Sequence, residues 1–268
     1  DASLMAVVAD SAALDSRDVV LEPGAGVGNL TGLLAARAGR VVAVEIDSSL
    51  HDIASRRLTG LTNLRLIRSD ILERGERIAP AVAAALAEDL AAVPGARLKV
   101  VANLPYIVST AFIAAALLED PVPVDIVAMV QREVADRLAA EPGTRDYGFL
   151  SVLVQAVARV ERLRRVPPGA FWPPPDVESA VVRVTPDPTL RRKAGDLVRL
   201  RSVAGALFRH RRKQLGGALL MTGLAPDRDH AARILSELGV SEKDRAETLS
   251  VPQFLRLAAL CSPAQPET

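Results

Sequence analysis

The segment Asn103-Leu104-Pro105-Tyr106 combines the groups that would hold a flat base carrying an exocyclic amine. Asn103 offers a side-chain oxygen, and Leu104 or Pro105 a backbone carbonyl, as acceptors for the amine hydrogens. Pro105 makes the turn rigid, and Tyr106 offers an aromatic face for stacking. An ordinary turn at the end of a strand has a similar composition, so the segment taken alone leaves both interpretations open.

A glycine-rich segment lies earlier in the chain, where Leu21-Glu22-Pro23 leads into Gly24, Gly26 and Gly28. Glycines at these positions let the backbone pass close under a ligand and present amides at the start of a helix. The third glycine of a dinucleotide-binding fingerprint would fall at Asn29, so that fingerprint is not matched. The G-x-G pattern alone is weak evidence.

Two acidic residues follow the next two apolar runs, and they point to a nucleoside ligand. Glu45 lies about 20 residues after the glycines, where a carboxylate accepts both hydroxyls of a ribose. Asp70 would accept from an adenine amine, with Ile46 and Ile71 covering the faces of the ring. One such acid alone would be interpreted as a loop residue or a helix cap. Here the glycine loop, Glu45 and Asp70 follow three consecutive strands, and this combination favours a nucleoside site.

Short apolar runs alternate with Ala- and Leu-rich stretches through the first 130 residues, which predicts parallel strands joined by helices on both faces of a sheet. Residues 151–166 and 179–184 predict two further strands that meet over a long connection and form an antiparallel edge. The strands expected in the first part of the chain are residues 19–21, 40–46, 64–69, 99–102 and 125–130.

Residues 190–262 predict several short helices, so we expect two domains, residues 1–188 and 189–268. Charge is distributed unevenly between them. Residues 1–188 hold 19 Lys and Arg against 24 Asp and Glu, whereas residues 189–268 hold 14 against 8. Six cations and no acid lie between Arg199 and Lys213, which indicates either a polyanion partner or a solvated helix face.

Composition excludes several classes of protein. The 268 residues are 49% hydrophobic, enough to fill a core, and no apolar run reaches the roughly 20 residues that span a bilayer. One cysteine excludes a framework of internal disulfides, and three scattered histidines show no metal-ligand spacing. A reducing cytosol fits this composition best.

These motifs together resemble those of the ribosomal RNA adenine dimethyltransferases. The resemblance spans essentially the whole chain, and residues 245–251 resemble the C-terminal end of the branch that acts on small-subunit RNA. The segments that carry it are Glu22 to Gly26, Val44 to Asp47, Asp70, Asn103 to Tyr106, Met129 to Leu138, Tyr147-Gly148, Val166 to Phe171, Pro173 to Val182, Arg211 to Leu215 and Arg245 to Val251.

The resemblance implies an α/β fold of the class I methyltransferase, Rossmann-like type: a mostly parallel seven-stranded sheet with an antiparallel edge strand, and a small helical C-terminal domain that binds RNA. It implies transfer of methyl groups from S-adenosylmethionine to the 6-amino groups of two adjacent adenines near the 3′ end of small-subunit (16S) ribosomal RNA, in an immature particle. We expect a monomer that needs neither metal nor membrane.

The resemblance also assigns roles to individual residues. Those expected at the reaction centre are Asn103, Leu104, Pro105, Tyr106 and Phe171, where Phe171 and Tyr106 sandwich the target base. Those expected at the cofactor are Gly24 and Gly26 for the methionine part, Glu45 and Ile46 for the ribose and one ring face, Asp70 and Ile71 for the adenine, and Asn103. Those expected to bind RNA are Arg209, Arg211, Arg212 and Lys213.

The sequence departs from the family pattern at two places. A segment that closes over the cofactor precedes the family's first helix, and its last Asp corresponds to Asp1; because the chain starts without Met, we expect trimming rather than loss of this segment. Asp176 stands where the family commonly has Lys, which puts an RNA contact there in doubt.

Three alternatives remain open. The first is a methyltransferase of the same fold that acts on large-subunit RNA and confers macrolide resistance. The second is a relative without turnover that acts as an assembly or binding factor, although intact residues 103–106 argue against it. The third is a nicotinamide dehydrogenase, which Asn29 and the lack of a proton donor near residue 103 disfavour.

Overall fold

The computed structural model describes residues 2–171 and 176–261, and it divides into two compact units. The first unit comprises Asp1–Ala135 and Arg159–Pro186, and the second comprises Asp136–Ala158 and Asp187–Thr268. The second unit thus contains, besides the C-terminal residues, a segment from the middle of the chain. Among the described residues, no helix is long and apolar enough to cross a membrane.

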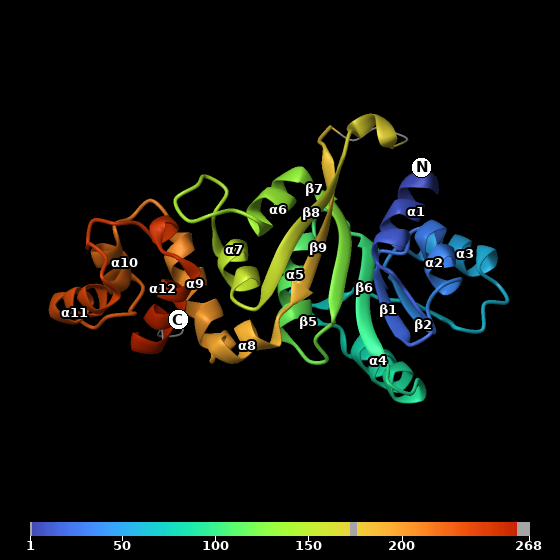
Figure 1. Cartoon of the computed structure of the whole chain (residues 1–268), viewed down its shortest axis with the longest axis horizontal. Helices are drawn as coiled ribbons and strands as arrows, with labels where there is room; N and C mark the ends of the chain where they lie inside the picture. Colours follow the sequence, from blue (N-terminus) through green and yellow to red (C-terminus); the bar gives the residue numbers. More distant parts are fainter. Residues whose placement is uncertain (1, 172–175, 262–268) are drawn as a thin grey trace. The chain divides into compact units, whose positions relative to one another are not determined.

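Seven strands form the sheet of the first unit, in the spatial order β3, β2, β1, β6, β7, β9, β8 (Figure 1). The pairs from β3 to β7 are parallel, β9 runs antiparallel to β7, and β8 lies outermost beside β9. This confirms the predicted mostly parallel sheet with an antiparallel strand at one side. The strands are β1 Asp18–Pro23, β2 Arg40–Glu45, β3 Leu64–Arg68, β6 Arg97–Asn103, β7 Asp125–Gln131, β8 Ala158–Val166 and β9 Ser179–Pro186.

The register brings the predicted site residues to one edge of the sheet. Asn103, the last residue of β6, pairs with Met129 of β7, and Ser179 at the start of the antiparallel β9 pairs with Gln131 at the end of β7. The order of the strands reverses at β1, which lies between β2 and β6. Ligands of open α/β sheets bind at the carboxyl ends of the strands beside such a reversal.

Helices cover both faces of this sheet. One face packs on α1 and α2 through residues such as Val20, Val101 and Val127. Residues that alternate with them, such as Leu21 and Val42, are also buried, which is typical of a sheet covered on both sides. The helices of this part of the chain are α1 Ala2–Ser11, α2 Asn29–Ala35, α3 Ser48–Arg57, α4 Pro80–Ala92, α5 Ser109–Leu118 and α6 Arg132–Leu138.

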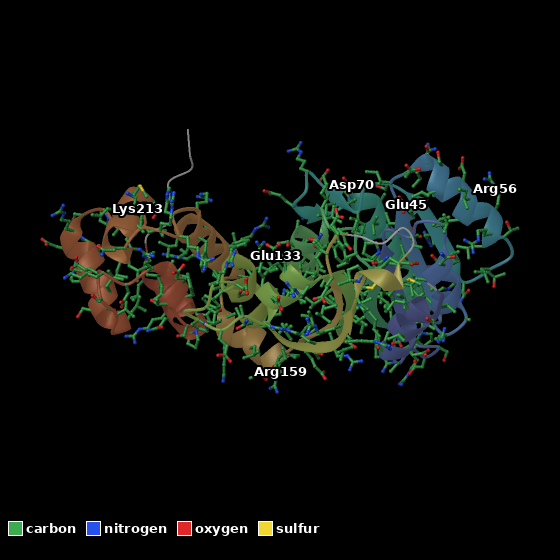
Figure 2. All side chains as sticks on the ribbon, turned by 90° about the horizontal axis from the view of Figure 1, so that it is seen from above. Glu45, Arg56, Asp70, Glu133, Arg159 and Lys213 are labelled. Atoms are coloured by element: carbon green, nitrogen blue, oxygen red, sulfur yellow. The ribbon has the colours of Figure 1, made fainter. Side chains whose placement is uncertain are left out.

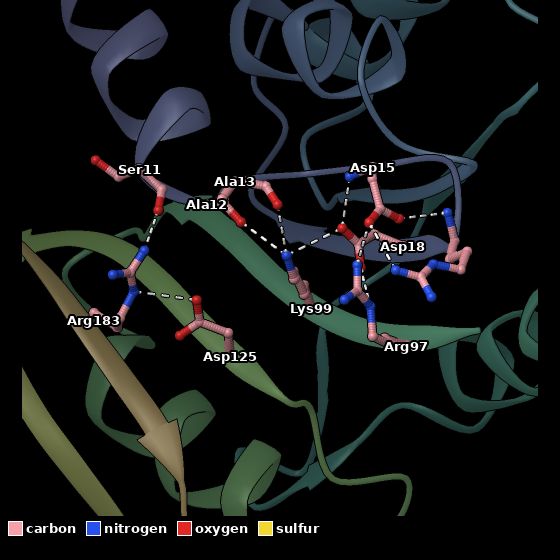
Figure 3. A network of polar contacts seen from close by, with 10 residues as sticks. Ser11, Ala12, Ala13, Asp15, Asp18, Arg97, Lys99, Asp125 and Arg183 are labelled. Carbon is pink, nitrogen blue, oxygen red and sulfur yellow. Dashed lines mark hydrogen bonds and ion pairs between the residues drawn. The ribbon is translucent and has the colours of Figure 1, made fainter. Parts of the chain in front are cut away.

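A polar network fastens the end of α1 to the opposite, amino-terminal edge of the sheet (Figure 3). Lys99 Nζ donates to the carbonyl oxygens of Ala12 (2.9 Å) and Ala13 (3.0 Å) and lies 3.1 Å from Asp18 Oδ2. Arg97 also pairs with Asp18, which is fully buried. Because a buried charge is tolerated only when it is paired and hydrogen-bonded, these contacts belong to the framework.

The predicted strand over residues 151–166 is wrong in its first part. Residues Phe149–Gln155 form helix α7, and the strand β8 begins only at Ala158. The helix begins where the Ser151 hydroxyl accepts from the Gly148 N–H (3.0 Å). Five consecutive residues, 150–154, are buried, and a short, mostly apolar run does not distinguish a buried helix from a buried strand. A two-stranded hairpin, β4 Leu72–Glu73 and β5 Arg77–Ile78, was also not predicted.

The second unit is helical, as the sequence predicts for residues 190–262. Its core contains an aromatic cluster in which Phe208 stacks on Phe254, with ring centroids 5.5 Å apart, and meets Tyr147 edge to face. The buried Tyr147 hydroxyl donates to the Leu249 carbonyl (2.9 Å). Its further helices are α8 Pro188–Ala194, α9 Leu197–Arg209, α10 Leu215–Met221, α11 Arg228–Leu238 and α12 Val251–Leu260.

Candidate active site

The glycine loop after β1 is held to the end of β2. The N–H groups of Gly24 and Ala25 both donate to the Val44 carbonyl, at 2.8 and 3.0 Å. Gly24, Gly26 and Gly28 have positive φ angles of 74°, 57° and 83°, which other residues rarely adopt. Within 4 Å of the position that a Cβ of Gly26 would take, there is no other atom of the described residues. The backbone therefore presents an open surface at Gly26.

Glu45, the last residue of β2, orients this loop. Its Oε2 accepts from the Gly26 N–H (2.7 Å) and its Oε1 accepts from the Asp47 N–H (2.9 Å), and only 6% of the residue is exposed. A carboxylate has about four acceptor positions, so both oxygens keep capacity for two further donors. This arrangement suits the paired hydroxyls of a ribose.

The Asn103 to Tyr106 segment lies directly beside the glycine loop. A Cβ built on Gly24 would lie 2.8 and 2.9 Å from ring carbons of Pro105 and 3.9 Å from the Asn103 carbonyl. The Leu104 N–H donates to the Met129 carbonyl (3.0 Å), and the Leu104 side chain is buried. Asn103 is exposed. The two predicted motifs are thus adjacent, and the absence of a side chain at Gly24 allows the approach.

Tyr106 lies at the rim of this region and is 41% exposed. Its hydroxyl lies 3.3 Å from the hydroxyl of Ser179, which begins β9. This contact holds one end of the ring while leaving part of the side chain accessible. Ser179 belongs to the Pro173 to Val182 motif, but its contact with Tyr106 was not predicted, because the two residues are 73 positions apart in the sequence.

The end of β3 completes the predicted nucleoside site. Glu45 and Asp70 are both labelled in Figure 2. The ends of β2 and β3 are joined by a hydrogen bond from the Ser69 N–H to the Glu45 carbonyl (3.1 Å). The Asp70 side chain is exposed and accepts from the Leu72 N–H (3.0 Å). Ile46 is exposed, whereas Ile71 is buried in the protein. Ile46 is therefore the better placed of the two to cover a ring.

Glu22 is a buried acid at this site to which the sequence analysis assigned no separate role. It lies at the end of β1 and is 1% exposed, and its Oε2 has no hydrogen-bond partner among the described residues. Burial raises the pKa of Glu22 to about 8, and the nearby negative charge of Glu45 also raises it. Glu22 therefore stays protonated at neutral pH.

Phe171 lies in a different environment from Tyr106. It is partly buried and packs against the hydrophobic cluster that contains Leu4, Met5 and Val166. The predicted pairing of Phe171 with Tyr106 around a base stays a prediction. Residues Pro173 to Pro175 of the same predicted motif lie outside the described residues.

Comparison with known proteins identifies the family. The family model for ribosomal RNA adenine dimethylase matches residues 1–262. The chain belongs to the ribosomal RNA adenine dimethylase family. It is 38% identical to the ribosomal RNA small subunit methyltransferase A of Bacillus thuringiensis over 96% of the chain and 86% of that protein, and equally identical to the protein of the same name from Pelotomaculum thermopropionicum.

Solved structures agree with this membership in the dimethylase family. The dimethyladenosine transferase from Plasmodium falciparum, 23% identical, superposes with a TM-score of 0.76 over 95% of this chain and 94% of its own. The 23S rRNA methyltransferase ErmE, 27% identical, superposes with a TM-score of 0.64 over 97% of both chains. The sheet order described above is thus that of a methyltransferase, and the protein is an enzyme of this class.

The basic residues expected to bind RNA differ in what they contact. Arg211 forms an ion pair with Glu247 and donates to the Arg145 carbonyl (2.7 Å), all within the second unit. Arg209, Arg212 and Lys213 are exposed. Arg211 therefore stabilises its own unit, whereas Arg212 and Lys213 direct their charge to the surface.

A further charged cluster lies beside Ser179 in this dimethylase family member. Glu178 Oε2 lies 3.1 Å from both Arg132 Nη1 and Arg165 Nη2, and hydrogen bonds from these cations, first from Arg165, lower the pKa of Glu178. Asp176, where the family commonly has Lys, is exposed. Two arginines therefore hold the Glu178 carboxylate one residue before β9 begins.

Proposed function

We propose that this enzyme transfers methyl groups from S-adenosylmethionine to the 6-amino groups of two adjacent adenines near the 3′ end of small-subunit ribosomal RNA. The observation that supports the proposal is the contact between the Gly24 loop and the Asn103 to Tyr106 segment, because the segment proposed to bind the cofactor nucleoside lies next to the one proposed to bind the target base. We propose that the enzyme acts as a monomer on an immature particle, without a metal.

The residues present fit the methyl donor. Glu45 offers two ordered oxygens to a ribose, the open surface at Gly26 admits the methionine part, and exposed Asp70 and Ile46 would meet the adenine. When bound, S-adenosylmethionine supplies a methyl group already activated by a sulfonium. The protein therefore has to align the reacting groups more than it has to supply an acid or a base.

Asn103 and a neighbouring carbonyl would hold the amine of the target adenine. The amine nitrogen is a poor nucleophile because its lone pair is delocalised into the ring, and two acceptors for its hydrogens favour the pyramidal form. Positive charge then develops on the nitrogen opposite acceptor oxygens. The Pro105 carbonyl already accepts from the N–H groups of Val108 and Ser109, both at 3.2 Å, which favours the Leu104 carbonyl as the second acceptor.

Tyr106 would stack on the target base, and we propose Phe171 as its partner on the other face. The Tyr106 ring is held through its hydroxyl near Ser179 and is exposed enough to meet a base that has left its stack. Arg209, Arg212 and Lys213 would contact phosphates, which position RNA without reading its sequence.

The second candidate is a methyltransferase for large-subunit RNA, favoured by the similarity to ErmE. The higher identity to proteins named for the small subunit, 38% against 27%, supports the first candidate. The test incubates the enzyme with labelled S-adenosylmethionine and, separately, immature small and large subunits, and maps dimethyladenine. Two adjacent dimethyladenines in small-subunit RNA alone are expected; methylation of large-subunit RNA alone supports the alternative, and labelling of neither contradicts both.

A further inference from the structure

Several exposed apolar side chains lie at the edge of the sheet that carries the proposed base site. Among the described residues, nine large apolar side chains are exposed, and Ile107, at 95%, is the most exposed of them. Ile46, Tyr106 and Val177 belong to the same set, and all four lie in segments at the carboxyl-end edge of the sheet. Single exposed apolar residues are ordinary, but a concentration at the mouth of a site is typical of a contact surface.

The turn that carries Ile107 is rigid. The Val108 and Ser109 N–H groups both donate to the Pro105 carbonyl, and the buried Ser109 hydroxyl donates to the Tyr106 carbonyl (3.1 Å). On one side of Ile107, the Pro105 ring packs closely against Gly24. On the other side, α5 begins at Ser109. Ile107 therefore sits at the apex of a turn fixed on both sides, so its exposure is set by the backbone.

We propose that Ile107 packs against the face of the nucleobase next to the target adenine. This inference rests on the proposed function. A base that enters the site leaves the apolar face of its neighbour uncovered, and proteins that unstack nucleic acids cover such faces with apolar side chains such as Ile, Leu or Met. Because Ile107 follows Tyr106 directly, a base held by Tyr106 brings the next nucleotide to the apex of the turn. A specificity role follows: Ile107 favours substrates with a large purine face beside the target.

The test compares Ile107→Ala and Ile107→Phe with the parent enzyme. Val124→Ala is the matched control, because Val124 is an exposed β-branched residue that precedes β7 at the opposite edge of the sheet. The measurements are kcat/KM for immature small subunits, the Kd for S-adenosylmethionine and the melting temperature. Ile107→Ala should lower kcat/KM about ten-fold, because it removes most of the apolar surface that would cover the neighbouring base.

Ile107→Phe keeps an apolar surface at the apex and should stay close to the parent, and all variants should keep the parent Kd and melting temperature. Methylation by the parent and by Val124→Ala establishes the proposed function independently of Ile107. If both of these enzymes methylate the substrate, an unchanged kcat/KM in Ile107→Ala overturns the role of Ile107 and leaves the proposed function standing. A loss shared equally by Ile107→Phe, or one explained by a lower melting temperature or weaker cofactor binding, also overturns it.

Discussion

The Glu45 carboxylate uses both oxygens to hold backbone N–H groups of the glycine loop and of the turn into α3. Its removal deletes the proposed ribose acceptor and loosens Gly26 at the same time. Glu45→Ala should weaken binding of S-adenosylmethionine by about 1 to 3 kcal/mol, measured by calorimetry. Asp47→Asn is the control, because Asn keeps the cap that Asp47 forms on α3. An unchanged Kd in Glu45→Ala would remove Glu45 from the site.

Glu22 predicts a pH dependence of stability. Its pKa is raised from 4.5 in an exposed reference to about 8 in the folded protein, so folding favours the protonated form. Its contribution is full below pH 4.5 and is lost as the pH rises through 8, by roughly 1.4 kcal/mol per pH unit in between. Glu22→Gln, which cannot ionise, should melt near the parent temperature at pH 5 and above it at pH 9. Equal melting temperatures at pH 9 would contradict the burial of a protonated acid.

Much of the candidate site was predictable at this scale, because its residues end consecutive strands. Glu45, Asp70 and Asn103 all lie at one edge of the sheet, as expected from their positions. The contacts of Tyr106 with Ser179 and of Gly24 with Pro105 were not predictable, because they join residues that only the strand register brings together.

At the scale of elements, Gly24 is the glycine at which the glycine loop and the Asn103 to Tyr106 segment approach each other. A methyl group at Gly24 would overlap Pro105, and alanine there also has an unfavourable positive φ angle. Gly60→Ala is the matched control, since Gly60 has a φ of 90° but nothing within 4 Å of the added carbon among the described residues. Gly60→Ala should cost about 1 to 2 kcal/mol of unfolding free energy from the backbone alone.

Gly24→Ala should cost more than Gly60→Ala in chemical denaturation and should also lower the affinity for S-adenosylmethionine. The added loss reports the overlap with Pro105, because the backbone penalty is common to both variants. Equal costs and an unaltered affinity would show that the two loops do not depend on this approach.

The predicted strands agree with the observed ones where turn residues flank a short apolar run. The strands near residues 40, 64 and 125 were expected within a few residues of their observed bounds. The helix α7 was missed because Leu150 to Val154 form one short, continuously buried run, and such a run shows no amphipathic period that would distinguish a helix from a strand. Hairpin β4 and β5 has two residues per strand, which is too short to produce a pattern.

At the scale of the whole molecule, the uneven charge predicts how RNA binding responds to salt. Each phosphate contact adds about 0.7 to the slope of log K against log salt for single-stranded RNA. Arg212→Gln with Lys213→Gln should therefore flatten the slope by about 1 to 1.5, measured by filter binding between 50 and 200 mM salt.

Arg211→Gln distinguishes a loss of RNA contacts from a loss of stability, because Arg211 is paired with Glu247 and bound to backbone carbonyls of its own unit. It should lower the melting temperature more than the double variant does and change the salt slope less. A slope unaltered in the double variant would show that these two cations belong to a solvated turn between α9 and α10 and do not contact RNA.

The account depends most on Asn103 acting on the amine of the target base rather than on binding of the methyl donor. The most direct measurement is the single-turnover rate of adenine methylation by Asn103→Ala at saturating S-adenosylmethionine and RNA, together with the Kd for S-adenosylmethionine. The rate should fall by a factor on the order of 100 or more, while the Kd changes much less. A single-turnover rate comparable to that of the parent enzyme would contradict the proposed role of Asn103.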